Sequence, residues 1–312
     1  MNLYLVTGGA GFIGSHVVRR LLARGDRVRI LDDMSTGRPA NLADIRADVD
    51  FVEGDIRDLP TVQRAATGTA AVFHLAARAS VPRSVAEPLP ANDVNITGTL
   101  NVLLAARDAG AERVIYSASS SAYGDTPTLP KIETMTPQPL SPYAVGKLAA
   151  ENYCTCFHTC YGLQTISLRY FNVFGPRQDP NSQYAAVIPA FVTHMVSGRR
   201  PVIFGDGEQS RDFCYIDNVV NANLLALEAA ELGGAVVNIA CGERTTLNEI
   251  VRLINGQLGT DLAAEHQDPR VGDVRHSLAD VAAAKRVIGY EPKIFFQEGL
   301  ARSIEWYRQN PS

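Results

Sequence analysis

Short apolar runs alternate with amphipathic segments through the first half of the chain. After the first run, Val17, Val18, Leu21 and Leu22 repeat with helical spacing. Short runs are typical of strands and a 3.6-residue period of helices, so the alternation predicts an α/β fold with a doubly wound parallel sheet. The predicted strands are residues 3–7, 27–31, 50–53, 71–75, 113–116 and 165–169, and the long predicted helices are 93–109 and 143–161.

The later part of the chain is expected to divide between two lobes. We expect the sheet domain to take residues 1–170 with a return near 211–240, and a smaller α/β substrate lobe to take 171–210 and 241–312. The chain crosses between the lobes more than once, so no linker rich in Pro and Gly marks a boundary. Ligands of such sheets lie beyond the carboxyl ends of the strands, which places the site in the cleft.

Composition and charge narrow the class of protein. The chain has 312 residues, of which 46% are hydrophobic and 20% charged, enough for a sizeable core. A net charge of −4 without a sustained basic run argues against nucleic acid or an anionic membrane as the main partner. No apolar run reaches the ~20 residues that cross a bilayer, and no secretory signal is evident, so we expect a cytoplasmic enzyme.

Three of the five cysteines lie on the predicted helix 143–161. Cys156 and Cys160 share a helix face, but no second pair completes a zinc set. We therefore expect Cys154, Cys156 and Cys160 to be buried thiols, and we expect no metal site.

A glycine-rich turn, Gly8-Gly-Ala-Gly-Phe-Ile-Gly14, joins the first predicted strand to a helix. Such glycines allow the backbone to approach a pyrophosphate, and the helix N-terminus supplies N–H groups. The second strand ends in Asp32, at the spacing of an acidic residue that holds ribose hydroxyls and repels a 2′-phosphate. The pattern predicts a Rossmann domain that binds NAD, with a purely structural turn as the alternative. The expected cofactor-binding residues are Gly8, Gly11, Phe12, Ile13, Gly14, Asp32, Asp55, Ile56, Ala76 and Ala77.

Tyr143 and Lys147 lie four residues apart at the start of a predicted helix, and therefore on one face. Ser141 is a favoured N-cap and Pro142 suits the first helical position. A tyrosine pKa near ~10 must fall by roughly three units, about 4 kcal/mol, before the phenol is a base at pH 7. An ammonium group about 4 Å away supplies energy of that order, so Lys147 is expected to lower the pKa of Tyr143. An ordinary surface pair is the alternative.

Taken together, residues 7–14, the serines 119–121 and the Tyr143–Lys147 pair resemble the extended short-chain dehydrogenase/reductase family over essentially the whole chain. The resemblance implies that Ser119 assists Tyr143 and Lys147 on a substrate hydroxyl beside the nicotinamide. It also implies that Tyr143 and Lys147 contact the cofactor and that Asn95 supports it. Later segments resemble those of members that modify UDP-sugars. That resemblance implies substrate contacts from Tyr170, Asn172, Phe204, Arg211, Arg270 and Asp273.

The two residues after Ser119 indicate which reaction the chain catalyses. Members that dehydrate the sugar carry an Asp-Glu pair there, whereas this chain has Ser120 and Ser121, hydroxyls that do not suit that elimination at neutral pH. Epimerisation at C4 of the sugar needs only the groups that this chain does have. Tyr143 would take the proton from O4, and a 4-keto sugar would turn over before hydride returns from a tightly bound NAD.

The substrate is expected to be a neutral UDP-hexose or its N-acetylated form, because several segments are similar to bacterial and archaeal UDP-N-acetylglucosamine 4-epimerases. Where epimerases restricted to plain hexoses have a tyrosine, Ser277 leaves room for an N-acetyl group. A UDP-uronic acid or UDP-N-acetylhexosaminuronate 4-epimerase, with Arg83 on the carboxylate, stays open, as does a catalytically idle NAD-binding regulator. The residues expected to line the sugar site are Ser84, Ser120, Ser121, Ala185, Ala186 and Val187.

A homodimer is the expected assembly. Helices 93–109 and 143–161 each carry more apolar residues than one buried stripe requires, and the family resemblance also implies that they pair with their copies. Covered core helices would have the same composition.

Overall fold

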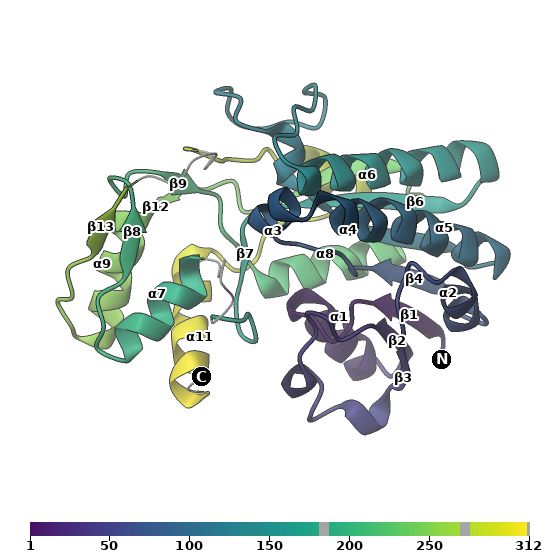
Figure 1. The fold of residues 1–312 in the computed structure, drawn as a ribbon, viewed down its shortest axis with the longest axis horizontal. Helices are drawn as coiled ribbons and strands as arrows, with labels where there is room; N and C mark the ends of the chain where they lie inside the picture. Colours follow the sequence, from purple (N-terminus) through teal and green to yellow (C-terminus); the bar gives the residue numbers. More distant parts are fainter. Residues whose placement is uncertain (181–186, 269–274, 311–312) are drawn as a thin grey trace.

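A seven-stranded sheet forms the centre of the molecule in the computed structural model, which describes residues 1–180, 187–268 and 275–310 (Figure 1). Its strand order is β11-β6-β5-β4-β1-β2-β3, and every neighbouring pair is parallel. The predicted doubly wound α/β fold is thereby confirmed. The strands are β1 (Leu3–Thr7), β2 (Arg27–Asp32), β3 (Asp50–Glu53), β4 (Ala71–His74), β5 (Arg113–Ser119), β6 (Gln164–Tyr170) and β11 (Ala235–Ile239).

Helices cover both faces of this sheet because successive residues of its inner strands point to opposite sides. On β1, Val6 belongs to the core shared with α1 and α8, whereas Leu5 belongs to the core shared with α2, α5 and α6. Both side chains are fully buried, which explains why the strands are short apolar runs. The helices of the two faces are α1 (Phe12–Ala23), α2 (Leu59–Ala66), α5 (Thr99–Asp108), α6 (Pro142–Tyr161) and α8 (Ile216–Glu228).

The predicted helix 93–109 is observed as part of a longer helical run. The run consists of α4 (Pro88–Asn92), a π-helical stretch (Asp93–Gly98) and α5. A further short helix, α3 (Val81–Ala86), precedes it, and both α3 and α4 pack against α6. Short 3-10 turns occupy Pro39–Asn41, Arg46–Asp48 and Ser120–Tyr123.

A second, smaller group of elements lies beside the sheet domain, on the left of Figure 1. It holds the parallel pair β8 and β13, and short pairs join β7 to β10 and β9 to β12. Its elements and the connecting strands are β7 (Val173–Phe174), α7 (Val187–Val196), β8 (Val202–Phe204), β9 (Ser210–Arg211), β10 (Cys214–Tyr215), β12 (Thr245–Thr246), α9 (Leu247–Leu258), β13 (Glu265–Gln267) and α11 (Phe296–Gln309). The late helix α10 (Ala282–Ile288) packs instead against β11 and α8 of the sheet domain.

The cysteines of α6 do not all lie where the sequence predicted. Cys154 is buried, but Cys156 and Cys160 are exposed, with their Sγ atoms 3.8 Å apart. The expectation of buried thiols was wrong for these two, because they lie on the outer face of α6 beside the exposed polar residues Asn152, Thr155 and Thr159. Across the described ranges, none of the helices combines the length and the apolar character needed to span a bilayer.

Candidate active site

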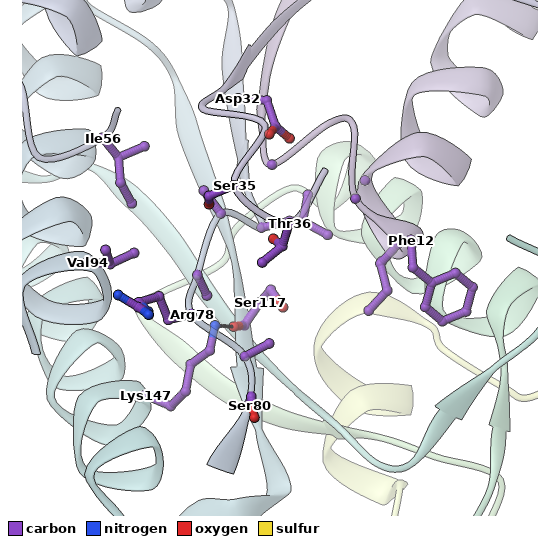
Figure 2. Close-up of a pocket in the computed structure, with 18 of the residues that line it drawn as sticks. Phe12, Asp32, Ser35, Thr36, Ile56, Arg78, Ser80, Val94, Ser117 and Lys147 are labelled. Atoms are coloured by element: carbon purple, nitrogen blue, oxygen red, sulfur yellow. Dashed lines mark hydrogen bonds between the residues drawn. The ribbon is translucent and has the colours of Figure 1, made fainter. Parts of the chain in front are cut away.

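A cavity of about 580 Å³ opens at the carboxyl ends of the sheet strands. Figure 2 shows Asp32 at one end of it and Lys147 with Ser117 at the other. The structure therefore brings both halves of the predicted site to one pocket. The predicted residues that line it are Gly8, Gly11, Phe12, Ile13, Gly14, Asp32, Ile56, Ala76, Ala77, Ser119, Tyr143, Lys147, Tyr170 and Asn172.

The glycine turn between β1 and α1 has no space for a Cβ at Gly8 or Gly14. A Cβ on Gly14 would lie 2.1 Å from the carbonyl oxygen of Gly8, and a Cβ on Gly8 would lie 2.7 Å from the backbone N of Ala76. Gly8 also has φ 72°, a conformation that favours glycine. Gly11 is the N-cap of α1 and offers no side-chain cap, so the turn and the helix N-terminus suit an anionic diphosphate.

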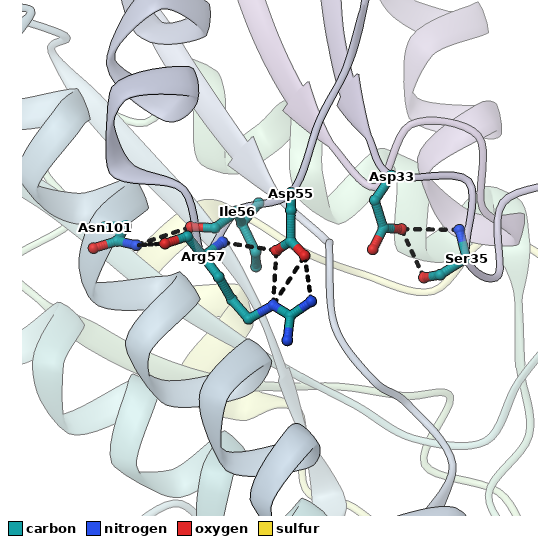
Figure 3. A network of polar contacts seen from close by, with 6 residues as sticks. All are labelled: Asp33, Ser35, Asp55, Ile56, Arg57 and Asn101. Atoms are coloured by element: carbon teal, nitrogen blue, oxygen red, sulfur yellow. Dashed lines mark hydrogen bonds and ion pairs between the residues drawn. The ribbon is translucent and has the colours of Figure 1, made fainter.

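Asp32 presents a fixed carboxylate at the end of β2. Its two oxygens accept hydrogen bonds from the backbone N atoms of Ala10 and Met34, both at 2.9 Å. Burial raises the pKa of Asp32, and these two hydrogen bonds act in the opposite direction. Asp33 follows and accepts hydrogen bonds from the backbone N and Oγ of Ser35 (Figure 3). Two adjacent carboxylates at this edge suit ribose hydroxyls and disfavour a 2′-phosphate.

The turn after β3 is held by side chains on both sides (Figure 3). Arg57 donates to Asp55 from Nε at 2.9 Å and from Nη2 at 2.5 Å, and it lowers the pKa of that carboxyl. Asn101 of α5 donates from Nδ2 to the carbonyl oxygens of Ile56 and Arg57, each at 3.0 Å. Ile56 and Arg57 line the pocket, whereas Asp55 lies beside its lining residues.

Asn95 acts on the pocket through the backbone of Arg78. Its Oδ1 accepts from the backbone N of Arg78 at 2.8 Å, and its Nδ2 donates to the carbonyl oxygen of Arg78 at 3.2 Å. The amide therefore shapes the loop after β4. His74, at the end of that strand, lies between the hydroxyls of Thr7 (2.7 Å) and Thr99 (2.9 Å), and burial lowers its pKa to about 3.

Tyr143 and Lys147 begin α6 as the sequence predicted. Ser141 caps the helix by accepting from the backbone N of Ala144, and Pro142 is its first residue. The phenol of Tyr143 is hydrogen-bonded to Ser119, and Lys147 donates from Nζ to the carbonyl oxygen of Ser117 at 2.6 Å. Burial lowers the pKa of Lys147 to about 7.

The electrostatic relation between Lys147 and Tyr143 differs from the expectation. Burial raises the pKa of Tyr143, and the hydrogen bond with Ser119, not the charge of Lys147, acts against that rise. The predicted lowering by Lys147 was wrong because its ammonium is held at the Ser117 carbonyl oxygen and is itself destabilised by burial.

Ser84 and Ser121 lie beside Tyr143 and Ser119. Ser84 Oγ accepts from the backbone N of Tyr143 at 3.1 Å, and Ser121 Oγ donates to Ser119 Oγ at 2.9 Å. Ser120 lies between Ser119 and Ser121 in the turn after β5. These three serines, predicted to line the sugar site, are not among the residues that line the cavity, and the structure places them beside Ser119 and Tyr143.

Three of the residues predicted to contact the substrate, Asn172, Arg211 and Ser277, lie close to the chain at residue 212. Asn172 donates from Nδ2 to the carbonyl oxygen of Asp212 at 2.9 Å and to Ser277 Oγ at 3.1 Å. Arg211 donates from Nη1 to the carbonyl oxygens of Ser210 and Arg275. Phe204 ends β8, and Val187 begins α7. The predicted contacts Ala185, Ala186, Arg270 and Asp273 lie outside the described residues.

Several residues that line the pocket were not predicted from the sequence. Ser117 carries the carbonyl that holds Lys147, and a backbone role leaves no side-chain signal. Arg78, Ser80 and Gln178 also line the pocket, and so do Ser35 and Thr36 near Asp32. Their position after strand ends was the available signal, because every sheet strand here delivers its following residues to the same edge.

The fold and the pocket define a dinucleotide-binding α/β protein with a serine, a tyrosine and a lysine at one end of its site. A model of the NAD-dependent epimerase/dehydratase family matches residues 4–240. The chain belongs to this family, as the sequence resemblance indicated, and its cofactor is NAD.

Individual relatives extend over the whole chain. The UDP-glucose 4-epimerase of Mycolicibacterium smegmatis is 41% identical over 308 residues, which cover 97% of this chain and 98% of the relative. The UDP-glucuronate 4-epimerase of Thermodesulfobacterium geofontis is 34% identical, and the match covers 99% of this chain and 97% of the relative. A solved UDP-N-acetylglucosamine 4-epimerase from Methanobrevibacter ruminantium M1, in complex with UDP-N-acetylmuramic acid, is 41% identical, with a TM-score of 0.94 over 99% of this chain and 98% of that chain.

Proposed function

We propose that this protein interconverts UDP-sugars at C4 through a transient 4-keto sugar. The observation that carries the proposal is the hydrogen bond between Tyr143 and Ser119 in a pocket that also holds Lys147. Ser120 and Ser121 supply no carboxyl group for an elimination of water. The relatives named as UDP-sugar 4-epimerases support the same reaction.

The chain's own residues fit NAD. The crowding at Gly8 and Gly14 leaves a bare backbone against which a diphosphate fits, and the fixed carboxylate of Asp32 suits the adenosine ribose. When bound, NAD supplies the acceptor that takes the C4 hydride and the donor that returns it. A cofactor recycled in this way does not need to leave, so we propose that it is tightly bound.

Tyr143 is the proposed acid and base at the sugar O4. Ser119 holds the phenol in place and opposes the rise of its pKa. Lys147 lines the same pocket, and its amino group is held in place because Nζ is bonded to the carbonyl oxygen of Ser117 and lies 4.9 Å from the ring centre of Tyr116. The residues therefore position one proton at the sugar O4. Epimerisation requires this proton to be removed once, when C4 is oxidised, and returned once, when C4 is reduced.

We propose that both N-acetylated and plain UDP-hexoses are substrates. A serine at 277 leaves space at the sugar 2-position, and its hydroxyl also bonds Asn172, the proposed diphosphate contact. Arg211, with Arg270 and Asp273, completes the proposed nucleotide site.

A UDP-uronic acid is the second candidate substrate. Arg78 and Arg83 line the pocket, and either guanidinium suits a carboxylate. Both are already paired with Glu87, at 2.5 Å for Arg78 and 3.4 Å for Arg83. A sugar carboxylate would have to displace Glu87, so we favour the neutral sugars.

We further propose a homodimer in the cytoplasm. Val85, Leu89 and Val145 are 62%, 75% and 48% exposed on α3, α4 and α6, which pack against one another. An apolar face of this kind suits a second copy. Light scattering after size exclusion should give a dimer, and a monomer at micromolar concentration would contradict it. The division into a sheet domain (1–170 and 211–240) and a substrate lobe (171–210 and 241–312) also stays our proposal.

Product analysis at equilibrium tests the proposed reaction. The purified protein is incubated separately with UDP-glucose, UDP-N-acetylglucosamine and UDP-glucuronate, and the sugars are separated. We expect the C4 epimers of the first two, no turnover by Tyr143→Phe, and little product from the uronate. Conversion of UDP-glucuronate alone would favour the second candidate.

A further inference from the structure

A buried carboxylate joins the three chain segments that build the substrate side. Asp212 has no exposed surface. Its Oδ1 accepts from the backbone N of Cys241 at 2.9 Å, and its Oδ2 accepts from the backbone N atoms of Gly242 at 3.0 Å and Ala279 at 3.1 Å. One side chain thus connects the residues after β9 with the end of β11 and with the segment that contains Ser277.

The backbone of the same residue holds two proposed substrate contacts. The carbonyl oxygen of Asp212 accepts from Asn172 Nδ2 at 2.9 Å, and its N–H points to Ser277 Oγ at 3.4 Å. Asn172 has φ 30°, an unusual conformation for a residue with a side chain, so its position depends on outside contacts. Arg211 precedes Asp212 directly, and its side chain also reaches the carbonyl of Arg275.

We propose that Asp212 is a positioning residue for UDP-sugar binding, which acts by holding Asn172, Ser277 and Arg211 in one arrangement. The inference rests on the proposed function, because these residues are its substrate contacts. Asp212 itself touches none of the reacting atoms. Its loss should therefore weaken the binding of the nucleotide sugar more than it slows the chemistry at C4.

The ionised form of Asp212 is the form that accepts three N–H bonds. Burial raises its pKa to about 6, while the bonds from Cys241, Ala279 and Gly242 lower it and the charge of Glu243 raises it. The other titratable groups that face it are Cys214 and Tyr290. The hydrogen bond with Cys241 and burial raise the pKa of Cys214, and burial raises the pKa of Tyr290, so both are neutral near pH 6. Below pH 6 a proton on Asp212 turns one acceptor into a donor, so binding should weaken as the pH falls.

Two measurements test this role. UDP binding is measured by calorimetry and UDP-glucose turnover by kinetics, for the parent and for Asp212→Asn, with NAD content recorded for each protein. The asparagine side chain offers only one acceptor oxygen, and its NH2 group would face backbone N–H donors that the carboxylate accepts from. Loss of a hydrogen bond to a charged group predicts that Kd and KM rise roughly tenfold or more, with kcat changed by less than about threefold. Asp217→Asn, a matched change on the surface next to Arg302, should leave Kd and KM unchanged.

The parent protein provides a test that does not depend on the folding of a variant. Its Kd for UDP should rise as the pH falls from about 7 to 5, and Asp212→Asn should lose that dependence. A flat Kd across this range, or a variant that binds UDP like the parent, would overturn the inference. If the parent binds UDP in the predicted manner but epimerises no sugar, the proposed function fails and the role of Asp212 in nucleotide binding stands.

Discussion

Lys147 Nζ lies 2.6 Å from the carbonyl oxygen of Ser117, and this contact fixes the cation of the site at the end of β5. Lys147→Met keeps the length of the side chain but removes the charge. We expect kcat to fall by roughly 10²–10⁴-fold, because the proposed role of Lys147 is to assist proton transfer at Tyr143. Steady-state kinetics with UDP-glucose measure the effect. A variant with more than half of the parent kcat would contradict it.

The same lysine makes a prediction about pH and stability. Burial lowers its pKa in the folded state from the ordinary 10.5 to about 7. Between pH 7 and pH 10 the unfolded chain therefore binds one more proton than the folded chain, so this group's contribution to stability rises with pH. The free energy of unfolding of the parent, minus that of Lys147→Met, should increase from pH 7 to pH 9. A constant difference would show that Lys147 stays charged in the folded protein.

Glu151 lies one turn beyond Lys147 on α6 and forms a buried ion pair with Arg169 of β6. Arg169 donates from Nε to Glu151 Oε2 at 2.9 Å, and the two side chains are only 3% and 4% exposed. Glu151→Gln leaves the guanidinium without its counter-charge and should cost roughly 3–5 kcal/mol of unfolding free energy. Urea denaturation measures this loss. Glu298→Gln, which breaks an exposed pair with Arg302, should cost less than about 1 kcal/mol.

Position 14 requires glycine because no side chain fits there, and not because the backbone needs the flexibility of glycine. A Cβ there would lie 2.1 Å from the backbone oxygen of Gly8, so Gly14→Ala must displace the turn that receives the diphosphate. We expect purified Gly14→Ala to contain little NAD, measured by absorbance after denaturation. A Cβ on Gly256, in α9, would have no heavy atom within 4 Å, and Gly256→Ala should retain NAD and gain about 0.5–1 kcal/mol of stability. Equal NAD contents in the two variants would contradict the steric argument.

Ser277→Tyr tests the proposed choice of sugar. The larger side chain should close the space at the sugar 2-position, so turnover of UDP-N-acetylglucosamine should disappear while UDP-glucose is still converted. Because Ser277 Oγ also accepts from Asn172, KM for UDP-glucose should rise as well. Ser277→Ala is the control, since it removes that hydrogen bond without closing the space. Retained turnover of the acetylated sugar by Ser277→Tyr would contradict the role of this position.

The sequence predicted those features that depend on residues close together in the chain. The strands β1 to β6, the glycine turn and the N-cap Ser141 follow from apolar runs, small residues and capping chemistry over a few positions. The alternation of strands and helices was also enough to bring Asp32 and Tyr143 to one pocket, because parallel strands present their carboxyl ends at one edge.

Other features depend on contacts that no local pattern encodes. The bond between Asn172 and Ser277 joins residues 105 positions apart, and Asp212 receives N–H groups from two further segments. Burial, which decides the direction of the pKa of Tyr143, results from packing of the whole domain. The four-residue spacing of Tyr143 and Lys147 therefore predicted the wrong direction for this pKa.

The most direct test of the central claim follows a label at the reacting carbon. UDP-glucose that carries deuterium at C4 is incubated with the protein in ordinary water, and the products are examined by NMR. The account predicts UDP-galactose that retains deuterium at C4, because the hydride that leaves this carbon returns to it within the same site. Loss of the label to solvent, or a product dehydrated at C5 and C6, would contradict the account.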